Sequence, residues 1–233
     1  MTPASVKIYD NTLRDGEQTV GVSFSAADKV RIARGLTAAG VPAFEAGFAG
    51  VSAQERAAIK AVVDLGLPAR VFSLARLHKA DLDAAQLSGV YGVTLIAPAS
   101  DAVMRARGAG DAAEVEAEIP VWIEYAKRKK LFVKFSCVDA TRAPFERLIR
   151  WYLLAKNAGA DMASYADTVG VGSPDGVSRA VGELKRILQM PLSLHAHNDL
   201  GLALANSLAA MSAGADEIQV TVNGLGERTG NTA

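Results

Sequence analysis

Short runs of β-branched and other apolar residues alternate along this chain with longer segments whose apolar residues recur at helical spacing. The short runs predict eight strands, at residues 6–9, 43–46, 70–74, 90–96, 132–137, 162–166, 192–197 and 217–222. Helices are predicted between them, among others at residues 26–39, 53–65, 112–128, 145–158 and 202–213. Strands that alternate with helices are typical of right-handed βαβ units and a parallel sheet.

Eight such units predict an α/β fold of the (β/α)₈ (TIM) barrel class, whose usual length of about 250 residues is close to the 233 residues here. A doubly wound open sheet is the competing architecture, and it favours a glycine-rich phosphate loop after the first strand. Residues 11–17 read Asn-Thr-Leu-Arg-Asp-Gly-Glu, a charged segment without a G-x-G-x-x-G pattern. We therefore predict a single barrel domain over residues 1–233.

The end of the chain departs from a complete barrel. The eighth predicted strand is followed by residues 223–231, which are rich in glycine, and no helical segment comes before Ala233. A missing eighth helix would uncover roughly several hundred Å² of apolar surface beside strands eight and one, more than soluble monomers usually expose. We expect that the chain is a fragment or that another chain covers this flank, in a homo-oligomer or as a second subunit.

Composition excludes several classes of protein. Basic and acidic residues number 25 each, so the net charge of zero gives no basis for binding nucleic acid or an anionic membrane. The single Cys137 excludes a disulfide-stapled scaffold, and we expect it to be a small buried residue rather than a nucleophile. No apolar run approaches the ~18 residues that span a bilayer, and the N-terminus lacks the apolar core of a signal peptide. We expect a cytoplasmic protein.

Two of the three histidines, His195 and His197, lie two residues apart in the seventh predicted strand. Alternate residues of a strand share a face, so both imidazoles are expected to point into the barrel mouth. Leu192, Leu194 and Ala196 would then point outward to the helices. A histidine pair of this kind can supply half of a divalent metal site. Two partly exposed histidines that bind only solvent are an equally good interpretation of this pair alone.

Arg14 and Asp15 follow the first strand, at the barrel end where enzymes of this fold keep their catalytic groups. Asp15 can complete a His₂-carboxylate set that leaves positions open for substrate, and Arg14 suits a developing enolate or oxyanion. An ordinary surface ion pair is the alternative. Glu45, in the second strand, is expected to point into the barrel, where a buried carboxylate needs a partner such as Arg14 or Arg76.

Longer motifs surround these residues. Residues 13–18, Leu-Arg-Asp-Gly-Glu-Gln, with Lys29 after a gap of ten residues, resemble the first signature of the isopropylmalate synthase and homocitrate synthase family. Residues 195–203, His-Ala-His-Asn-Asp-Leu-Gly-Leu-Ala, resemble its second signature. Residues 167–170, Asp-Thr-Val-Gly, resemble the family's sixth-strand motif, and residues 223–231 resemble its Gly-Glu-Arg-x-Gly-Asn loop. The match extends from the first strand almost to the last residue, in the family's order and spacing.

The resemblance implies a metal-dependent (β/α)₈ enzyme of the kind called a DRE-TIM metallolyase, which condenses acetyl-CoA with a 2-oxo acid. It implies a divalent cation, Mg²⁺, Mn²⁺ or Zn²⁺, held by Asp15, His195 and His197. Asn231 would lie in or near the coordination shell of that cation. The family's synthases also have a C-terminal region beyond the barrel, and we expect that residues 1–233 do not include it.

The same resemblance implies further roles. Arg14 would be catalytic and would stabilise the enolate, and acetyl-CoA would lie beside Gly224 and Gly226. The 2-oxo acid would be bound by Gln18, Arg76 and Thr168.

Three departures from the family bear on activity. Val138 stands where its synthases carry a glutamate, and Val103 stands where many isopropylmalate synthases place a histidine. The His and Tyr that act in acetyl-CoA deprotonation come from the absent C-terminal region. A general base contributes about 10²–10⁴ in rate, so we expect activity to need an additional C-terminal segment or a partner chain.

Two other functions are weighed against the synthase. Carbon–carbon lyases and aldolases share the fold, but the related lyases carry a catalytic Cys in the loop at 223–231, where this chain has none. A barrel without catalysis, kept as a binding or regulatory subunit, is suggested by Val138 and the absent C-terminal region. The intact set of Arg14, Asp15, His195 and His197 argues against it.

Overall fold

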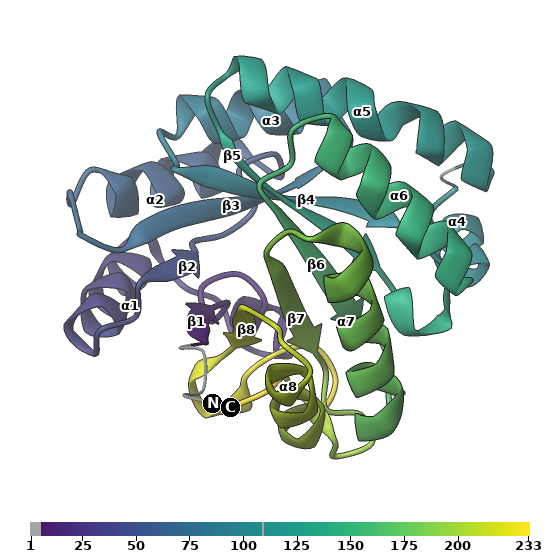
Figure 1. The fold of residues 1–233 in the computed structure, drawn as a ribbon. Helices are drawn as coiled ribbons and strands as arrows, with labels where there is room; N and C mark the ends of the chain where they lie inside the picture. The colour runs from purple at the N-terminus through teal and green to yellow at the C-terminus, as the bar shows by residue number, and fades with distance from the viewer. Residues whose placement is uncertain (1–5, 109) are drawn as a thin grey trace.

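A closed barrel of parallel strands forms the centre of the computed structural model, which describes residues 6–108 and 110–233. The strands follow one another around the barrel in chain order, and β8 pairs with β1 to close it (Figure 1). They are β1 (Lys7–Asp10), β2 (Ala43–Glu45), β3 (Arg70–Arg76), β4 (Gly92–Pro98), β5 (Phe132–Val138), β6 (Met162–Asp167), β7 (Leu192–Ala196) and β8 (Glu217–Val220). The predicted (β/α)₈ fold is confirmed.

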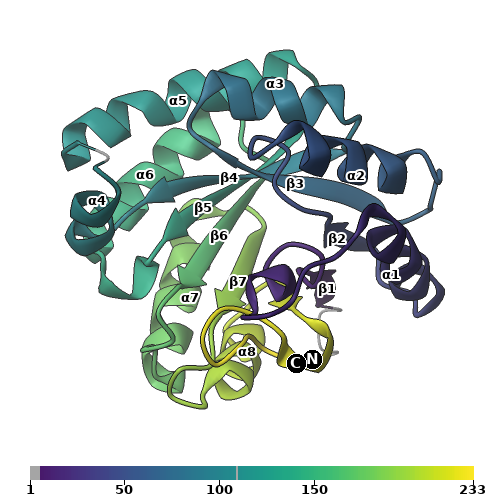
Figure 2. The same cartoon turned by 180° about the vertical axis from the view of Figure 1, so that it is seen from behind.

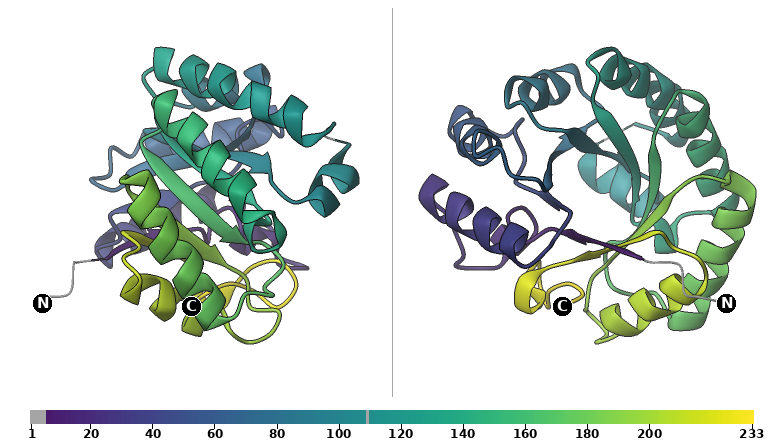
Figure 3. Two further views of the ribbon diagram at one scale, coloured as in Figure 1. Left: turned by 45° about the vertical axis from the view of Figure 1, so that its right-hand side comes forward. Right: turned by 60° about the vertical axis from the view of Figure 1, so that its left-hand side comes forward.

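Helices surround the barrel on its outside, as Figures 2 and 3 show from other directions. They are α1 (Ala26–Ala38), α2 (Ala53–Val63), α3 (Lys79–Leu87), α4 (Asp101–Arg107), α5 (Ala112–Arg128), α6 (Phe145–Asn157), α7 (Pro174–Leu188) and α8 (Ala203–Ser212). A capping box marks the start of α1. Ser25 Oγ accepts a hydrogen bond from Asp28 N, and the Asp28 carboxylate accepts one from Ser25 N. In the part of the chain that the structure describes, no helix is both long and apolar enough to cross a membrane.

The segment after β8 is not helical within the described residues, as the sequence predicts. A 3₁₀ turn (Val222–Gly224) leads into residues 225–233, which return to the end of β7. There Asn198 N donates to Gly230 O at 2.9 Å, and Thr232 N donates to Ala196 O at 3.2 Å. These bonds fix the glycine-rich loop across the same end of the barrel at which the histidines lie.

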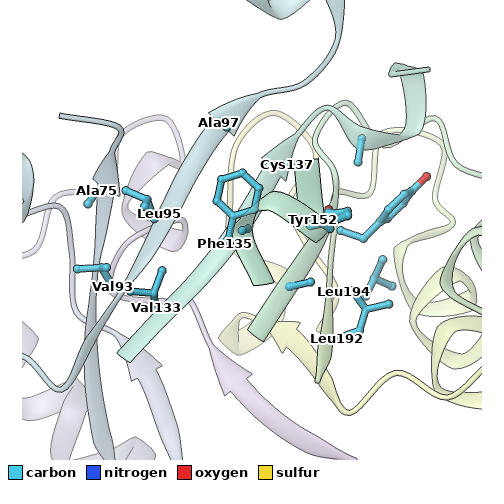
Figure 4. Packing of buried hydrophobic residues seen from close by; sticks show 14 of the residues in the cluster. Ala75, Val93, Leu95, Ala97, Val133, Phe135, Cys137, Tyr152, Leu192 and Leu194 are labelled. Atoms are coloured by element: carbon cyan, nitrogen blue, oxygen red, sulfur yellow. The ribbon is translucent and has the colours of Figure 1, made fainter. Parts of the chain in front are cut away.

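Apolar side chains on the outer face of the strands pack against the helices and form the core (Figure 4). Leu192 and Leu194 are fully buried in it, as the alternation in β7 predicts. Cys137 also lies there with no exposed surface, and burial raises the pKa of its thiol to about 12. A thiol that stays protonated is a poor nucleophile, so the interpretation of Cys137 as a small buried residue is confirmed.

The interior of the barrel is polar. Lys134 from β5 and Glu217 from β8 form an ion pair there, and both side chains are almost completely buried. The Lys134 ammonium also lies 3.1 Å from the centre of the Tyr9 ring, a cation–π contact. Burial lowers the pKa of Lys134, because the charged form loses its hydration. Glu217 additionally accepts a hydrogen bond from Ser193 Oγ at 2.8 Å.

Removing only one charge of this pair is expected to be costly. K134M would leave the Glu217 carboxylate buried and unpaired, and we expect it to lower the free energy of unfolding by about 3–5 kcal/mol. K134M/E217Q would remove both charges and is expected to recover more than half of that loss. Urea denaturation of the three proteins measures this. A K134M protein as stable as the wild type, or a double variant less stable than K134M, would contradict the expectation.

Candidate metal and substrate site

A tight turn after β1 places Asp15 over the open end of the barrel. The backbone N–H groups of Arg14, Asp15 and Gly16 all point to Asn11 O, at 3.1, 2.8 and 3.2 Å. This turn directs the Asp15 carboxylate toward β7, where His195 and His197 share the inner face as predicted. Asp15 Oδ2 lies 3.1 Å from His195 Nε2 and 3.7 Å from His197 Nε2. The two Nε2 atoms are 3.1 Å apart.

These three atoms fit one cation. Ligand atoms about 2.0–2.2 Å from a common ion lie some 3–4 Å from one another, as they do here. Both oxygens of Asp15 are buried, and its Oδ1 has no hydrogen-bond partner, nor has Asn231 Oδ1. Buried polar atoms are normally satisfied, so an unpaired carboxylate oxygen beside two imidazoles is consistent with a cation at this point. The chain thus holds a possible divalent metal site made of carboxylate and imidazole donors.

The protonation states suit such a site. Burial raises the pKa of the Asp15 carboxyl, but the positive charge of Arg14 and the contacts with His195 and His197 together outweigh burial and hold that pKa well below its usual range. Burial, together with the charge of His195, lowers the pKa of His197 to about 3. Asp15 is therefore anionic and His197 neutral near pH 7, the forms in which carboxylate and imidazole bind metals.

Arg14 is held between two carboxylates. Its Nε donates to Glu45 Oε2 at 2.5 Å, and its Nη1 lies 3.2 Å from Asp15 Oδ2. Glu45 has no exposed surface, and its expected partner Arg14 is confirmed. Burial alone would lower the pKa of Arg14, but the two carboxylates raise it, so the guanidinium is permanently charged. This is a buried ion-pair network rather than a surface pair.

A cavity of about 660 Å³ opens beside these residues. Asp15, Arg14 and both histidines line it, together with Gln18 and Thr168. Thr168 Oγ1 accepts a hydrogen bond from Asp139 N at 2.7 Å, which leaves the hydroxyl proton free to be donated. Val138 lies on the wall and is nearly buried, so an apolar group occupies the end of β5.

Arg76 and the two loop glycines lie elsewhere. The Arg76 guanidinium forms a bidentate pair with Asp81 at the start of α3, at 2.8 and 2.9 Å, and it is not among the residues that line the cavity. Gly224 and Gly226 contact Asn231 rather than the cavity. A methyl group at Gly226 would overlap the Asn231 amide, so this glycine lets Asn231 approach the metal site.

Three residues that the sequence reasoning did not assign also shape the site. Asn11 and Gln219 are buried inside the barrel, with Asn11 Nδ2 at 3.2 Å from His195 Nδ1 and 2.7 Å from Gln219 Oε1. Glu217 and Gln219 stand two residues apart in β8, and this polar alternation was a readable signal of an inward polar face. Arg107, from α4, lines the cavity, and we find no sequence signal for its position.

Lys29, the last residue of the first signature, anchors the loops at the cavity. Its ammonium is fully buried and lies 2.8 Å from Glu17 Oε2 and 2.7 Å from Glu55 Oε1. Glu17 belongs to the loop after β1, and Glu55 to α2. A methyl group at Gly47 would overlap the Glu55 carboxylate, so glycine leaves room for this cluster. The buried Lys29 ammonium thus joins the segment after β1 to α2 beside Gln18.

The sequence of this chain is similar to those of known synthases. The homocitrate synthase of Methanothermobacter thermautotrophicus is 43% identical over 231 residues, which is 99% of this chain and 59% of that protein. The 2-isopropylmalate synthase of Methanocaldococcus jannaschii is 45% identical over 233 residues, 99% of this chain and 45% of that protein. The chain therefore spans about half the length of these curated relatives.

Solved structures agree on the fold. The hydroxymethylglutaryl-CoA (HMG-CoA) lyase of Bacillus subtilis superposes with a TM-score of 0.87, covering 99% of this chain and 83% of the lyase, at 22% identity. The carboxyl transferase domain of Rhizobium etli pyruvate carboxylase superposes with a TM-score of 0.79 at 16% identity, covering 100% of this chain and 42% of that chain. At such low identity these likenesses show the fold alone. The HMGL-like family matches residues 5–233, nearly the full length, and the chain belongs to that family.

Proposed function

We propose that this barrel is the catalytic part of a divalent-metal-dependent acyltransferase that condenses acetyl-CoA with a 2-oxo acid. The observation that carries the proposal is the convergence of Asp15, His195 and His197 beneath Arg14 at one cavity. Its relatives at 43–45% identity are homocitrate and isopropylmalate synthases. The lyase alternative rests on likeness of fold alone, and the loop at 223–231 has no Cys.

A cation bound by Asp15, His195 and His197, with Asn231 beside them, would act as a Lewis acid toward the carbonyl of the 2-oxo acid. Mg²⁺, Mn²⁺ and Zn²⁺ are all compatible with these donors. Thr168 donates its free hydroxyl proton to the substrate carboxylate, and Gln18 contributes a polar contact on the same wall. Arg14, fixed by Glu45, stabilises the negative charge that develops on the reacting oxygen.

The proton transfer from acetyl-CoA needs a base that the cavity wall at β5 does not supply. Val138 stands at the end of this strand, and its side chain can neither accept nor donate a proton. We propose that this base comes from a segment outside the barrel, either in the same polypeptide or in a partner chain. Acetyl-CoA would enter beside the loop of Gly224 and Gly226, and Arg76 would need to leave Asp81 in order to reach the substrate.

The metal site is tested by titrating the metal-free protein with Mn²⁺ and following the free ion by electron paramagnetic resonance. We expect one bound ion per chain. D15A and H197A each remove a ligand and are expected to weaken binding at least 100-fold, because loss even of outer-shell partners costs 10–100-fold. H78Q changes the histidine outside the site and serves as the matched control. Absence of saturable binding to the wild type would favour a barrel without catalysis.

Substrate binding and turnover are tested with pyruvate, 2-oxoisovalerate and 2-oxoglutarate. With Mn²⁺ present, one of these acids should raise the thermal midpoint, and T168V should weaken its binding about 10-fold or more, because a hydrogen bond to a charged group contributes about 1.5–3 kcal/mol. T37V, on α1, is the control.

In a protein that includes the segment or partner supplying the base, release of thiol from acetyl-CoA should require both the cation and the acid. R14K should reduce it about 100-fold or more, since lysine cannot bridge Glu45 and the substrate. Cleavage of HMG-CoA without any acid would instead favour the lyase.

We also propose that another polypeptide surface, a second copy or a further segment, covers the apolar flank near β1 and α8. Leu204 and Leu208 of α8 are 58% and 54% exposed, and Ile8 of β1 is 41% exposed. Apolar patches of this kind mark interaction sites. If a second copy covers it, sedimentation equilibrium should show a dimer that L204S/L208S converts to a monomer. A wild-type monomer at all concentrations would exclude self-association.

A further inference from the structure

A chain of buried polar side chains leads from His195 into the barrel. Asn11 Nδ2 lies 3.2 Å from His195 Nδ1 and 2.7 Å from Gln219 Oε1. Gln219 Nε2 lies 3.1 Å from Ser164 Oγ and 3.1 Å from Ser193 Oγ. All five residues are at most 8% exposed, so these groups depend on one another for hydrogen bonds rather than on bulk water.

This arrangement fixes where the His195 ring carries its proton. The Asn11 amide nitrogen donates to Nδ1, so the proton of the neutral ring lies on Nε2, facing Asp15 Oδ2 at 3.1 Å. A ring that binds a cation through Nε2 needs the opposite tautomer, with its proton on Nδ1 and an acceptor facing that proton. Nε2 is the atom that faces both Asp15 and His197. The ligating form of His195 therefore requires Asn11 Oδ1 opposite Nδ1.

The neighbours of Asn11 can accommodate that exchange. The two ends of a carboxamide have nearly the same shape, so a half turn of Asn11 exchanges its ends and brings Oδ1, which has no hydrogen-bond partner before the turn, to Nδ1. Oδ1 would then face Gln219 Oε1, so Gln219 must turn as well and donate through Nε2. After this turn Gln219 Oε1 faces two hydroxyl groups. Ser164 donates to it, while Ser193 continues to donate to Glu217 Oε1, 2.8 Å away.

We propose that Asn11 and Gln219 are positioning residues for the cation, and that a coupled half turn of their carboxamides selects the His195 tautomer that binds it. The proposal rests on the proposed function, because it needs a cation at Asp15, His195 and His197. In this exchange the cation takes the place of the proton on Nε2, and Nδ1 takes up one proton. The exchange therefore neither consumes nor releases a proton overall.

Two substitutions of Asn11 are expected to affect Mn²⁺ binding differently. N11L leaves the Nδ1 proton of the ligating tautomer without an acceptor, and we expect Mn²⁺ to bind about 10–100-fold more weakly. N11D offers a carboxylate oxygen to Nδ1 and an acceptor to Gln219, so it should bind Mn²⁺ at least as tightly as the wild type. S73A, a buried hydroxyl of β3 outside this chain of contacts, is the matched control.

The role of Gln219 is tested by a double-mutant cycle. Q219L removes the donor that orients Asn11, so it should weaken Mn²⁺ binding in the wild-type background. The same substitution should have little effect in N11D, because a carboxylate presents an oxygen to His195 in either orientation. Equal losses in the two backgrounds would show that Gln219 acts independently of Asn11, and would overturn the coupled turn.

The tautomer is read directly from the ¹⁵N shifts of the His195 ring. We expect the proton on Nε2 in the metal-free protein and on Nδ1 after addition of Mg²⁺ or Zn²⁺, and on Nδ1 in N11D under both conditions. Wild-type Mn²⁺ affinity in a folded N11L protein, or a proton that stays on Nε2 when the cation is bound, would overturn the proposal. If the wild type binds no divalent cation, the proposed function fails instead. Circular dichroism verifies the fold of each variant. If N11L does not fold, the Mn²⁺ affinity and the His195 tautomer of N11D still test the proposal.

Discussion

The buried carboxylate of Asp15 is the constraint on which the rest of this site depends. Its side chain is 1% exposed, and its Oδ1 has no hydrogen-bond partner. Burying an ion costs several kcal/mol unless other charges and dipoles replace its hydration. Arg14 supplies part of this compensation, and it can do so only because Glu45 holds the guanidinium in place. The folded chain thus tolerates an anion whose remaining lone pairs point to the two imidazoles.

Ion pairs between neighbouring segments hold the groups of this site in position. Lys29 ties the loop after β1 to α2, and Arg228 of the glycine-rich loop binds Asp199 after β7 while donating to Thr168 O at 2.7 Å. The elements that carry the ligands are therefore fastened to their neighbours as well as to the barrel. Such preorganisation matters because ligand and catalytic groups must be held within a fraction of an ångström of their working positions.

The sequence predicted the barrel and the convergence of Asp15, His195 and His197 because both follow from local rules. Period-two alternation along β7 and into the residue after it put His195 and His197 on the inner face, and parallel strands place Asp15 at the same end. The position of Arg76 did not follow, because a bidentate pair with Asp81 depends on how the chain turns into α3. The contact of Asn11 with Gln219 did not follow either, since 208 residues separate them and only the stagger of the closed barrel brings them together.

The net charge of the site bears on the effect of having Val138 where related synthases carry a glutamate. With neutral histidines, Asp15, Glu45 and Arg14 together carry one negative charge, so a divalent cation leaves the site with one positive charge. The carboxylate of a 2-oxo acid would neutralise it, which favours an anionic substrate in a low-dielectric cavity. A carboxylate at position 138 would cancel that charge before the substrate arrived, unless it were protonated. Val138 itself cannot act as a base, so in the proposed reaction the base would approach from the open end of the cavity.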